Sequence, residues 1–289
     1  MRTTRSLLVL LAGLTLTATA CAPADSGSTS TGSGSASADA CAKDALKLET
    51  AGTLTIGTDK PAYTPWFVDD TPSNGKGFES AVAYAIAEKL GFAASEVTWT
   101  VVKFDSLFSP KPTTFDFDIN QISITDERAK VVDFSSGYYD VAQAVVATKT
   151  SPIAGATSLA DLAKGRLGAA VGTTSYDAIL NQIKPTTKPS AFPDNDKAKL
   201  ALSNGQIDGL VVDLPTALYL AGVEIEGGVV VGQVPNAGGG GEQFGLLLEK
   251  DSPLTGCVTQ AVDALRADGT LKKLETQWLT TSDGAKVLS

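Results

Sequence analysis

The sequence predicts an α/β fold organised as two lobes. Short β-branched runs alternate with segments of helical periodicity, which is typical of helices packed on a sheet. The alternation occurs once before Thr148 and again after it. The chain is 43% hydrophobic, enough for one large core or two smaller ones, so each set of elements could form its own lobe.

The first set begins with a strand and a helix whose apolar residues form one face. Phe78, Val82, Ile86 and Leu90 recur every fourth position, and Gly91 follows as a C-terminal glycine. The expected elements are, in order, a strand at 54–57, a helix at 78–90, a strand at 97–102 and a short buried strand that contains Ile119, Ile122 and Ile124.

The second set has the same character. Its expected elements are a strand at 167–171, a helix from Ser175, a helix at 196–202, a strand at 210–212 and a helix at 215–220. A strand at 246–248 and an amphipathic helix through Leu254, Val258, Ala261, Val262 and Leu265 follow.

The N-terminus has the pattern of a lipoprotein signal. Arg2 and Arg5 precede an apolar run at 7–16, and small residues lead to Cys21. We expect a signal peptide at 1–20 and a lipidated, flexible Ser/Gly/Thr/Ala tether at 21–40; an ordinary cleaved secretory signal is the alternative. The apolar run is shorter than the roughly 20 residues that span a bilayer, so the membrane contact would be the lipid alone.

Two cysteines remain once Cys21 is set aside. Cys41 and Cys257 are an even pair in an exported chain, which favours one disulfide between them. Two separately buried thiols are the alternative.

Charge and composition exclude several functions. The formal net charge of −9 disfavours binding to nucleic acid or anionic lipid. The chain has no histidine, so common metal sites and nucleophile–base pairs are missing; we expect no metal, no cofactor and no catalytic residue.

One segment has the residue types of a carboxylate site. Thr125 is expected to cap a helix that carries Arg128, and an arginine fork can grip both oxygens of a carboxylate while Ser123 donates beside it. Alternatively, Arg128 is a solvated residue paired with Asp126 or Glu127.

These residues belong to a series of motifs that resembles the amino-acid-binding receptors of bacterial ABC importers, the family 3 solute-binding proteins. The resemblance extends in order from Gly52 to Leu279. Its motifs are Gly52–Asp59, Gly77-Phe78-Glu79, Ser123-Ile124-Thr125-Asp126-Glu127-Arg128, Asp133-Phe134-Ser135, Tyr138-Tyr139, Gly172-Thr173-Thr174, Val211-Val212-Asp213 and Ala267–Thr270 with Trp278.

The resemblance implies a two-lobed periplasmic-binding-protein-like fold of type II. Lobe 1 would comprise 41–147 and 242–289, and lobe 2 would comprise 148–241. Two hinge crossings, near 145–149 and 235–241, would flank a ligand cleft between the lobes.

It also implies roles for individual residues. Arg128, Ser123 and Thr174 would bind an α-carboxylate, with Thr173 at the same helix start, and Asp213 would bind an α-ammonium. Asp213 could instead cap the helix at Pro215. Further candidates for the ligand site are Asp59, Gln121, Tyr63, Trp66 and Phe104, of which the aromatic residues could equally be core.

Three features depart from the family pattern. Gln121 stands where a small residue is usual, prolines interrupt the segment 108–112, and glycines fill 238–241. We expect a polar amino acid as ligand.

The main hypothesis is a monomeric, extracytoplasmic binding protein that delivers an amino acid to a membrane permease with a separate ATPase. A cyclohexadienyl-dehydratase-like enzyme, with Asp59 or Glu242 as general acid, is an alternative. An extracellular amino-acid sensor is another.

Overall fold

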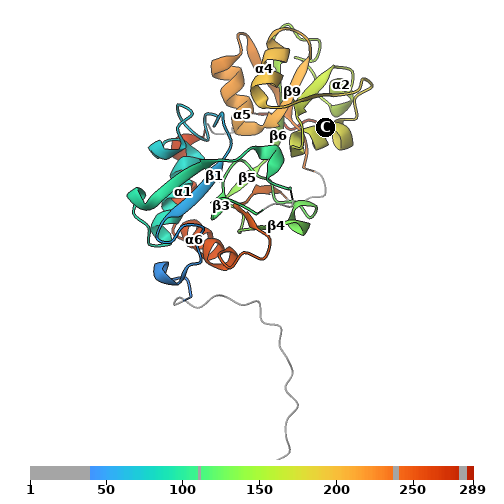
Figure 1. The fold of residues 1–289 in the computed structure, drawn as a ribbon. Helices are drawn as coiled ribbons and strands as arrows, with labels where there is room; N and C mark the ends of the chain where they lie inside the picture. The colour runs from blue at the N-terminus through green and yellow to red at the C-terminus, as the bar shows by residue number, and fades with distance from the viewer. Residues whose placement is uncertain (1–39, 110–111, 237–240, 280–284) are drawn as a thin grey trace, which may run out of the picture. The chain divides into compact units, whose positions relative to one another are not determined.

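The computed structural model describes residues 40–109, 112–236, 241–279 and 285–289, all within the compact unit Ser35–Ser289. Within these ranges, two five-stranded sheets and one two-stranded sheet form an α/β fold (Figure 1). The predicted signal peptide, Cys21, almost all of the tether, and most of the glycine run at 238–241 lie outside the described residues.

The first sheet has the strand order β2-β1-β3-β12-β4. β1 pairs in parallel with β2 and β3, while β12 is antiparallel to β3 and β4. The strands are β1 (Leu54–Thr58), β2 (Val97–Val101), β3 (Phe117–Asp118), β4 (Val132–Phe134) and β12 (Leu247–Glu249).

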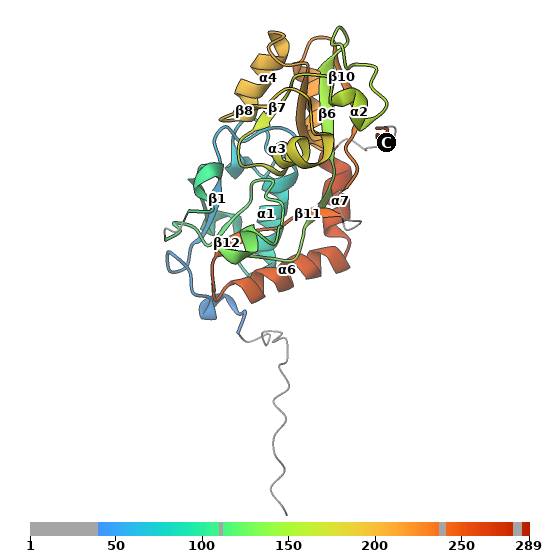
Figure 2. The ribbon, with the colours of Figure 1, turned by 90° about the vertical axis from the view of Figure 1, so that its right-hand side faces the viewer.

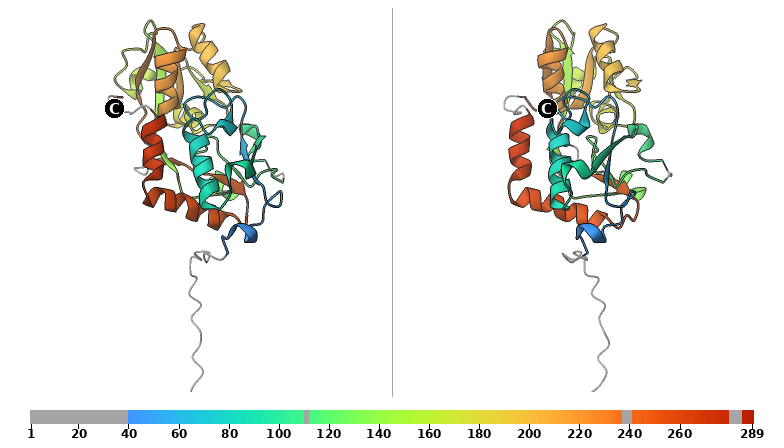
Figure 3. Two further views of the ribbon diagram at one scale, coloured as in Figure 1. Left: turned by 90° about the vertical axis from the view of Figure 1, so that its left-hand side faces the viewer. Right: turned by 60° about the vertical axis from the view of Figure 1, so that its left-hand side comes forward.

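Three helices cover one face of this sheet. Side chains of α1 (Phe78–Lys89), α6 (Thr255–Ala267) and α7 (Thr270–Trp278) share a core with Leu54 and Ile56 of β1. Figures 2 and 3 show the three helices side by side. The recurrence of apolar residues at every fourth position of α1 therefore predicted its buried face correctly. Gly91 follows the helix with a φ of 86°.

The second sheet has the order β10-β6-β9-β7-β8. Its strands are β6 (Gln143–Thr148), β7 (Leu167–Ala170), β8 (Ser190–Phe192), β9 (Gly209–Asp213) and β10 (Gly228–Gln233). Its helices are α2 (Leu159–Leu162), α3 (Thr174–Ala178), α4 (Asn195–Ser203) and α5 (Leu214–Tyr219), with single π-helical turns at Ile179–Ile183 and Leu220–Glu224.

Both faces of the second sheet are covered. In β6, Ala144 and Val146 pack with α4 and α5, whereas Val145 and Ala147 pack with α2 and α3. Burial on both faces explains why this strand is apolar at every position from 144 to 147, with no alternation.

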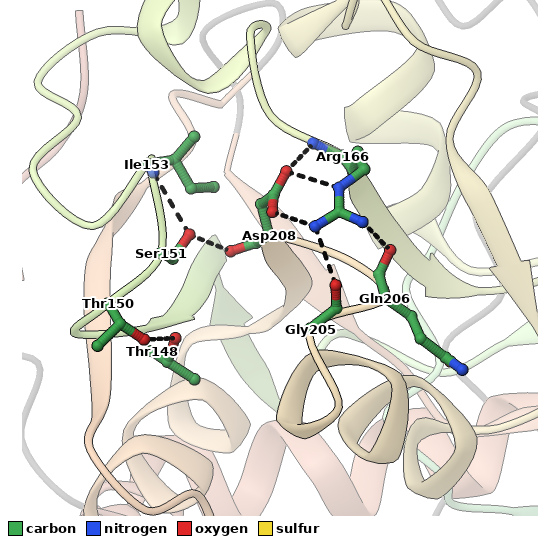
Figure 4. A network of polar contacts seen from close by, with 8 residues as sticks. All are labelled: Thr148, Thr150, Ser151, Ile153, Arg166, Gly205, Gln206 and Asp208. Carbon is green, nitrogen blue, oxygen red and sulfur yellow. Dashed lines mark hydrogen bonds and ion pairs between the residues drawn. The ribbon is translucent and has the colours of Figure 1, made fainter.

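An ion pair between Arg166 and Asp208, with further hydrogen bonds, holds the start of β7 beside the start of β9. The Arg166 guanidinium donates to both Asp208 oxygens, at 3.0 and 2.6 Å, and also to the carbonyls of Gly205 and Gln206 (Figure 4). Ser151 donates to the Asp208 carbonyl at 2.7 Å. These bonds fix the loop that precedes β9, the strand that ends at Asp213.

The first change of sheet differs from the crossing predicted near 145–149, whereas the second lies between the end of β10 at Gln233 and the start of β11 at Glu242, in line with the crossing expected near 235–241. β5 (Tyr139–Val141) and β11 (Glu242–Phe244) pair with each other, and all of β6 belongs to the second sheet. The expected division at 147/148 therefore falls inside a strand, because the apolar run of β6 gave no sign of which sheet it joins. The segment 285–289, assigned to lobe 1, bonds to Gln233 and Leu159 of the second sheet's layer.

The short buried strand expected at 119–124 is also wrong. β3 ends at Asp118, and Gln121 turns the chain with a φ of 47°. Ile119 and Ile122 are buried as expected, but they lie in an irregular segment. Arg128 begins a single 3₁₀ turn, Arg128–Lys130, in place of a longer helix.

Cys41 and Cys257 form a disulfide across 216 residues, which confirms the predicted pairing. It joins the first described residues to α6. None of the helices in the described ranges is both long and apolar enough to cross a bilayer.

Replacing Cys41 and Cys257 together with serine is expected to lower the free energy of unfolding by about 2–5 kcal/mol, since the disulfide restricts the unfolded chain. Urea unfolding measures this loss. Ligand affinity should stay unchanged, because neither cysteine lines the pocket described below. Equal stability of the variant and the wild type would contradict a stabilising role.

Candidate binding site

The predicted ligand residues gather around one pocket of about 260 Å³, with Trp66 as the exception. The first sheet and its loops contribute Asp59, Tyr63, Phe104, Gln121, Ser123 and Arg128, and the second contributes Thr173, Thr174 and Asp213. Side chains from two sheets therefore face the same space.

Trp66 is buried in the first core, with 0% of its surface exposed. Its ring makes edge contacts with Phe78, Tyr139 and Phe244. Its Nε1 donates to Thr216 Oγ1 of α5 at 2.9 Å. Of the two aromatic residues between which the sequence could not decide, Tyr63 lines the pocket and Trp66 does not.

Thr216→Val is expected to lower the free energy of unfolding by about 1–3 kcal/mol, because it leaves the buried indole N–H without an acceptor. Chemical denaturation measures the effect. Thr216→Ser keeps the hydroxyl and serves as the matched control. If the two variants lost the same stability, the hydrogen bond would not be the cause.

Arg128 is held by two backbone carbonyls and two aromatic rings. Nη1 donates to the Ser123 carbonyl at 2.7 Å and Nη2 to the Gly172 carbonyl at 3.0 Å. The guanidinium carbon lies 4.7 Å from the ring centre of Phe108 and 5.5 Å from that of Phe104. The predicted alternative, a pair with Asp126 or Glu127, does not occur among the described contacts, where Glu127 pairs with Lys130.

Burial lowers the pKa of Arg128, while the charges of Glu242, Asp177 and Asp213 act to raise it. A guanidinium stays charged under these conditions. Its fixed fork can therefore receive a carboxylate in the pocket that it lines.

The hydroxyls of Thr125 and Thr173 accept backbone hydrogen bonds near the starts of helical turns, and that of Thr174 faces Ser123. Thr125 Oγ1 accepts from the Arg128 backbone N–H at 3.2 Å, although Glu127 and not Thr125 is the N-cap of the short turn that follows. Thr173 is the N-cap of α3 and accepts from the Tyr176 N–H at 3.2 Å. Thr174 contacts Ser123, with 3.2 Å between the two hydroxyl oxygens.

Asp213 ends β9 and accepts a hydrogen bond from Gln143 Nε2 at 2.9 Å. It precedes α5, but its side chain makes no capping bond to that helix in the described structure. Burial, followed by the negative charge of Glu242, raises the pKa of Asp213 to about 8. A positively charged group nearby would favour its ionised form.

Asp59 and Tyr63 line the pocket from the loop that follows β1. The Asp59 oxygens accept from the backbone N–H groups of Lys60 at 2.6 Å and Phe104 at 3.1 Å. Burial raises the pKa of Asp59, and these two bonds act against that change.

Gln121 faces both the pocket and a buried carboxylate. Its backbone N–H donates to Glu79 at 2.7 Å, and its side-chain amide and the Tyr138 hydroxyl also bind that carboxylate. Burial raises the pKa of Glu79 to about 7, although these donors lower it. The positive φ of Gln121 favours glycine, and the bonds to Glu79 hold the larger residue in place.

Sequence reasoning missed several polar residues of the site. Gln143, which donates to Asp213, was not predicted, and Glu242, which accepts from Ser123, was considered only as the general acid of the enzyme alternative. The further lining residues Lys60, Lys103, Asp105, Asn120, Ser175, Asp194 and Asn195 were not predicted. Asp194 carried a detectable signal, because aspartate is a common N-cap and it stands just before the helix predicted at 196–202.

No group of three or more His, Cys, Asp or Glu side chains in the described ranges is arranged to hold an ion. The site combines a guanidinium, carboxylates, hydroxyls and aromatic rings, which suits a small polar solute.

The pocket is lined by residues from both five-stranded sheets, and the paired strands β5 and β11 lie where the chain passes between those sheets. This arrangement is typical of proteins that bind small solutes. Residues 54–281 match the model of the bacterial extracellular solute-binding proteins, family 3. The chain belongs to this family.

Relatives of known name agree with this assignment. The chain is 31% identical over 204 residues to ABC transporter arginine-binding protein 1 of Escherichia coli (strain K12), covering 70% of this chain and 81% of the relative. Two solved structures share 30% identity and cover 79% of this chain. An ancestral arginine-binding protein bound to glutamine has a TM-score of 0.66 over 98% of its own chain. The ancestral amino-acid-binding protein AncCDT-1, a precursor of cyclohexadienyl dehydratase, has a TM-score of 0.65 over 96%.

Proposed function

We propose that the protein binds a free amino acid and delivers it to an ABC importer. Arg128 would bind the α-carboxylate with Ser123 and Thr174, and Asp213 would bind the α-ammonium. The observation that carries this proposal is that a guanidinium from one sheet and a carboxylate from the other line the same pocket. A zwitterion would bind both, whereas a simple amine or acid would bind only one.

The ligand's side chain is proposed to be polar, with arginine as the first candidate. Acidic residues outnumber basic ones around the pocket, and Lys60 is already paired with Asp70 at 3.0 Å. Asp59 has carboxylate lone pairs left after its two backbone bonds, and a guanidinium could use them. The relative and the ancestral protein named above for arginine support this choice.

A thermal-melt screen of the twenty amino acids tests the proposal. At 1,000 times its dissociation constant, a ligand adds about 4 kcal/mol of stability, which the melt would report as a clear rise. We expect the largest rise with arginine. No rise with any amino acid would overturn the proposed function.

The dehydratase alternative rests on one observation. A general acid must hold a proton near neutral pH, and the raised pKa of Asp213, about 8, meets that need beside Arg128. Asp59 or Glu242, the acids considered from the sequence, would then have supporting roles. Incubation with prephenate decides: product formation would favour the enzyme, and unchanged prephenate would exclude that reaction.

Transport would require further partners. A monomer would present its loaded form to a permease driven by a separate ATPase, and closure of the two lobes on the ligand would signal loading. The disulfide supports a location outside the cytoplasm, where such bonds form and persist.

The N-terminus is proposed to anchor the protein. Residues 1–20 would be removed and Cys21 would carry lipid, with 22–40 as the tether. Cys21→Ala is expected to move the protein from the membrane fraction into the medium or periplasm, as measured by immunoblotting. A wild-type protein without lipid on Cys21, by mass spectrometry, would favour the ordinary secretory signal.

A further inference from the structure

Glu242, the first residue of β11, binds polar groups on both sides of the pocket. Ser123 Oγ donates to its Oε1 at 2.5 Å. Gln143 Nε2 lies 3.3 Å from each of its oxygens. Because Ser123 belongs to the first sheet's loops and Gln143 begins β6 of the second sheet, this carboxylate connects the two halves of the site.

Gln143 joins Glu242 to Asp213. Its Nε2 donates to Asp213 at 2.9 Å as well as lying near Glu242, so two carboxylates compete for one amide group. The amide cannot turn freely, because its Oε1 accepts from Ser175 at 2.6 Å. Gln143 itself is 3% exposed, so water offers little help in separating the two negative charges.

Other charged groups face this pair from several elements. Glu79 of α1 adds negative charge to Asp213, and Arg128 adds positive charge to both carboxylates. Tyr138 and Tyr139 also lie within the field of Asp213, and Asp177 of α3 lies within that of Glu242. Arg128 alone is positive in this set, so it does not balance the acidic groups.

We propose that Glu242 is a positioning residue of the ammonium site, whose charge holds a proton on Asp213 until the ligand's ammonium arrives and displaces it. This inference rests on the proposed amino-acid binding at the same pocket. Glu242 would act through Gln143 and Ser123, not by touching the ligand, since it does not line the pocket.

The step balances as a proton exchange. The O–H bond of the Asp213 carboxyl breaks and its proton passes to the buffer, while an N–H of the ammonium donates to the carboxylate that results. Binding therefore becomes weaker as the pH falls through the range in which Asp213 is protonated. Each pH unit in that range should raise Kd about tenfold.

The protein without ligand gives the first test. Carboxyl ¹³C NMR should show one aspartate that titrates near neutral to mildly alkaline pH and that Asp213→Asn removes. Glu242→Gln should shift this titration to lower pH, because it removes the charge and keeps an oxygen for Ser123. Exposed Glu249→Gln is the matched control and should leave it unchanged. Titration of Asp213 in the ordinary aspartate range in the wild type would overturn the inference.

Calorimetry with L-arginine gives the second test. Titrations at pH 7 are run in phosphate and in Tris, whose protonation enthalpies differ. The difference in binding heat between the two buffers should correspond to about one proton released per arginine for the wild type and for Glu249→Gln. Glu242→Gln should release almost none, and its Kd should no longer change about tenfold between pH 6 and 7. If Glu242→Gln released as many protons per arginine as Glu249→Gln, the role of Glu242 would be overturned. No heat with any amino acid would overturn the proposed function instead, while NMR would still decide the coupling of Asp213 to Glu242.

Discussion

Arg128→Met should weaken amino-acid binding by about 10²–10⁴-fold. The substitution removes a donor fork that could make two charge-assisted hydrogen bonds, worth about 1.5–3 kcal/mol each. The chain should stay folded, because methionine can still pack against Phe104 and Phe108, and the Ser123 and Gly172 carbonyls can accept bonds from water. Isothermal calorimetry with L-arginine measures the loss.

Two companion variants show which property of Arg128 matters. Lys130→Met changes an exposed cation on the same 3₁₀ turn, one paired with Glu127 at 2.5 Å, and should bind normally. Arg128→Lys keeps the charge but loses the guanidinium fork, so its affinity for arginine should be higher than that of Arg128→Met and lower than that of Lys130→Met. If Arg128→Met bound arginine as tightly as the wild type, the carboxylate assignment would be wrong.

Asp213→Asn should abolish binding and yet stabilise the protein without ligand at pH 8. Burial and the charge of Glu242 raise the pKa of Asp213 to about 8 in the folded state, far above the aspartate value in an unfolded chain. The folded state therefore holds a proton that the unfolded state has lost, and stability falls as the pH rises between these two pKa values. An amide at this position has no charge to bury and can still accept from Gln143.

Thermal melts at several pH values measure this effect. At pH 8 the Tm of the variant should exceed that of the wild type by a few degrees, and at pH 5 the difference should be smaller. For a domain of this size, about 1 kcal/mol corresponds to roughly 2–4 °C in Tm. Asp140→Asn, at an exposed position of β5, is the matched control and should show no such trend. A variant less stable than the wild type at pH 8 would contradict the raised pKa.

The element types could be predicted where hydrophobic periodicity was strong. The fourfold pattern of α1 and that of α6 gave helices with the correct buried faces. Arg128 and Asp213 could be selected because each stands in a short motif beside an apolar segment, and both line the pocket. Their roles in binding stay predictions.

The remaining features depend on contacts between distant parts of the chain. Gln143 and Glu242 are 99 residues apart, and neither stands in a motif that would draw attention to the other. The irregular path at 119–124 reflects the buried carboxylate of Glu79, which binds the backbone and side chain of Gln121. Trp66 was ambiguous because an aromatic residue looks the same in a core as against a ligand.

The change of sheet at β6 was missed for a related reason. A strand buried on both faces is uniformly apolar, so its sequence does not reveal its neighbours. The sequence of the last residues likewise gave no indication of the sheet against which they pack. In the structure, Leu288 is 1% exposed within the second core, and the Gln233 N–H donates to the Lys286 carbonyl at 2.7 Å.

The disulfide and this C-terminal segment together place the two ends of the folded chain in different cores. Cys41 is fastened to α6 of the first core, whereas Leu288 packs in the second. A donor fluorophore near one end and an acceptor near the other would therefore read the distance between the cores directly. Labels at these two positions would thus report any change in that distance when a ligand binds, with no label placed near the binding pocket.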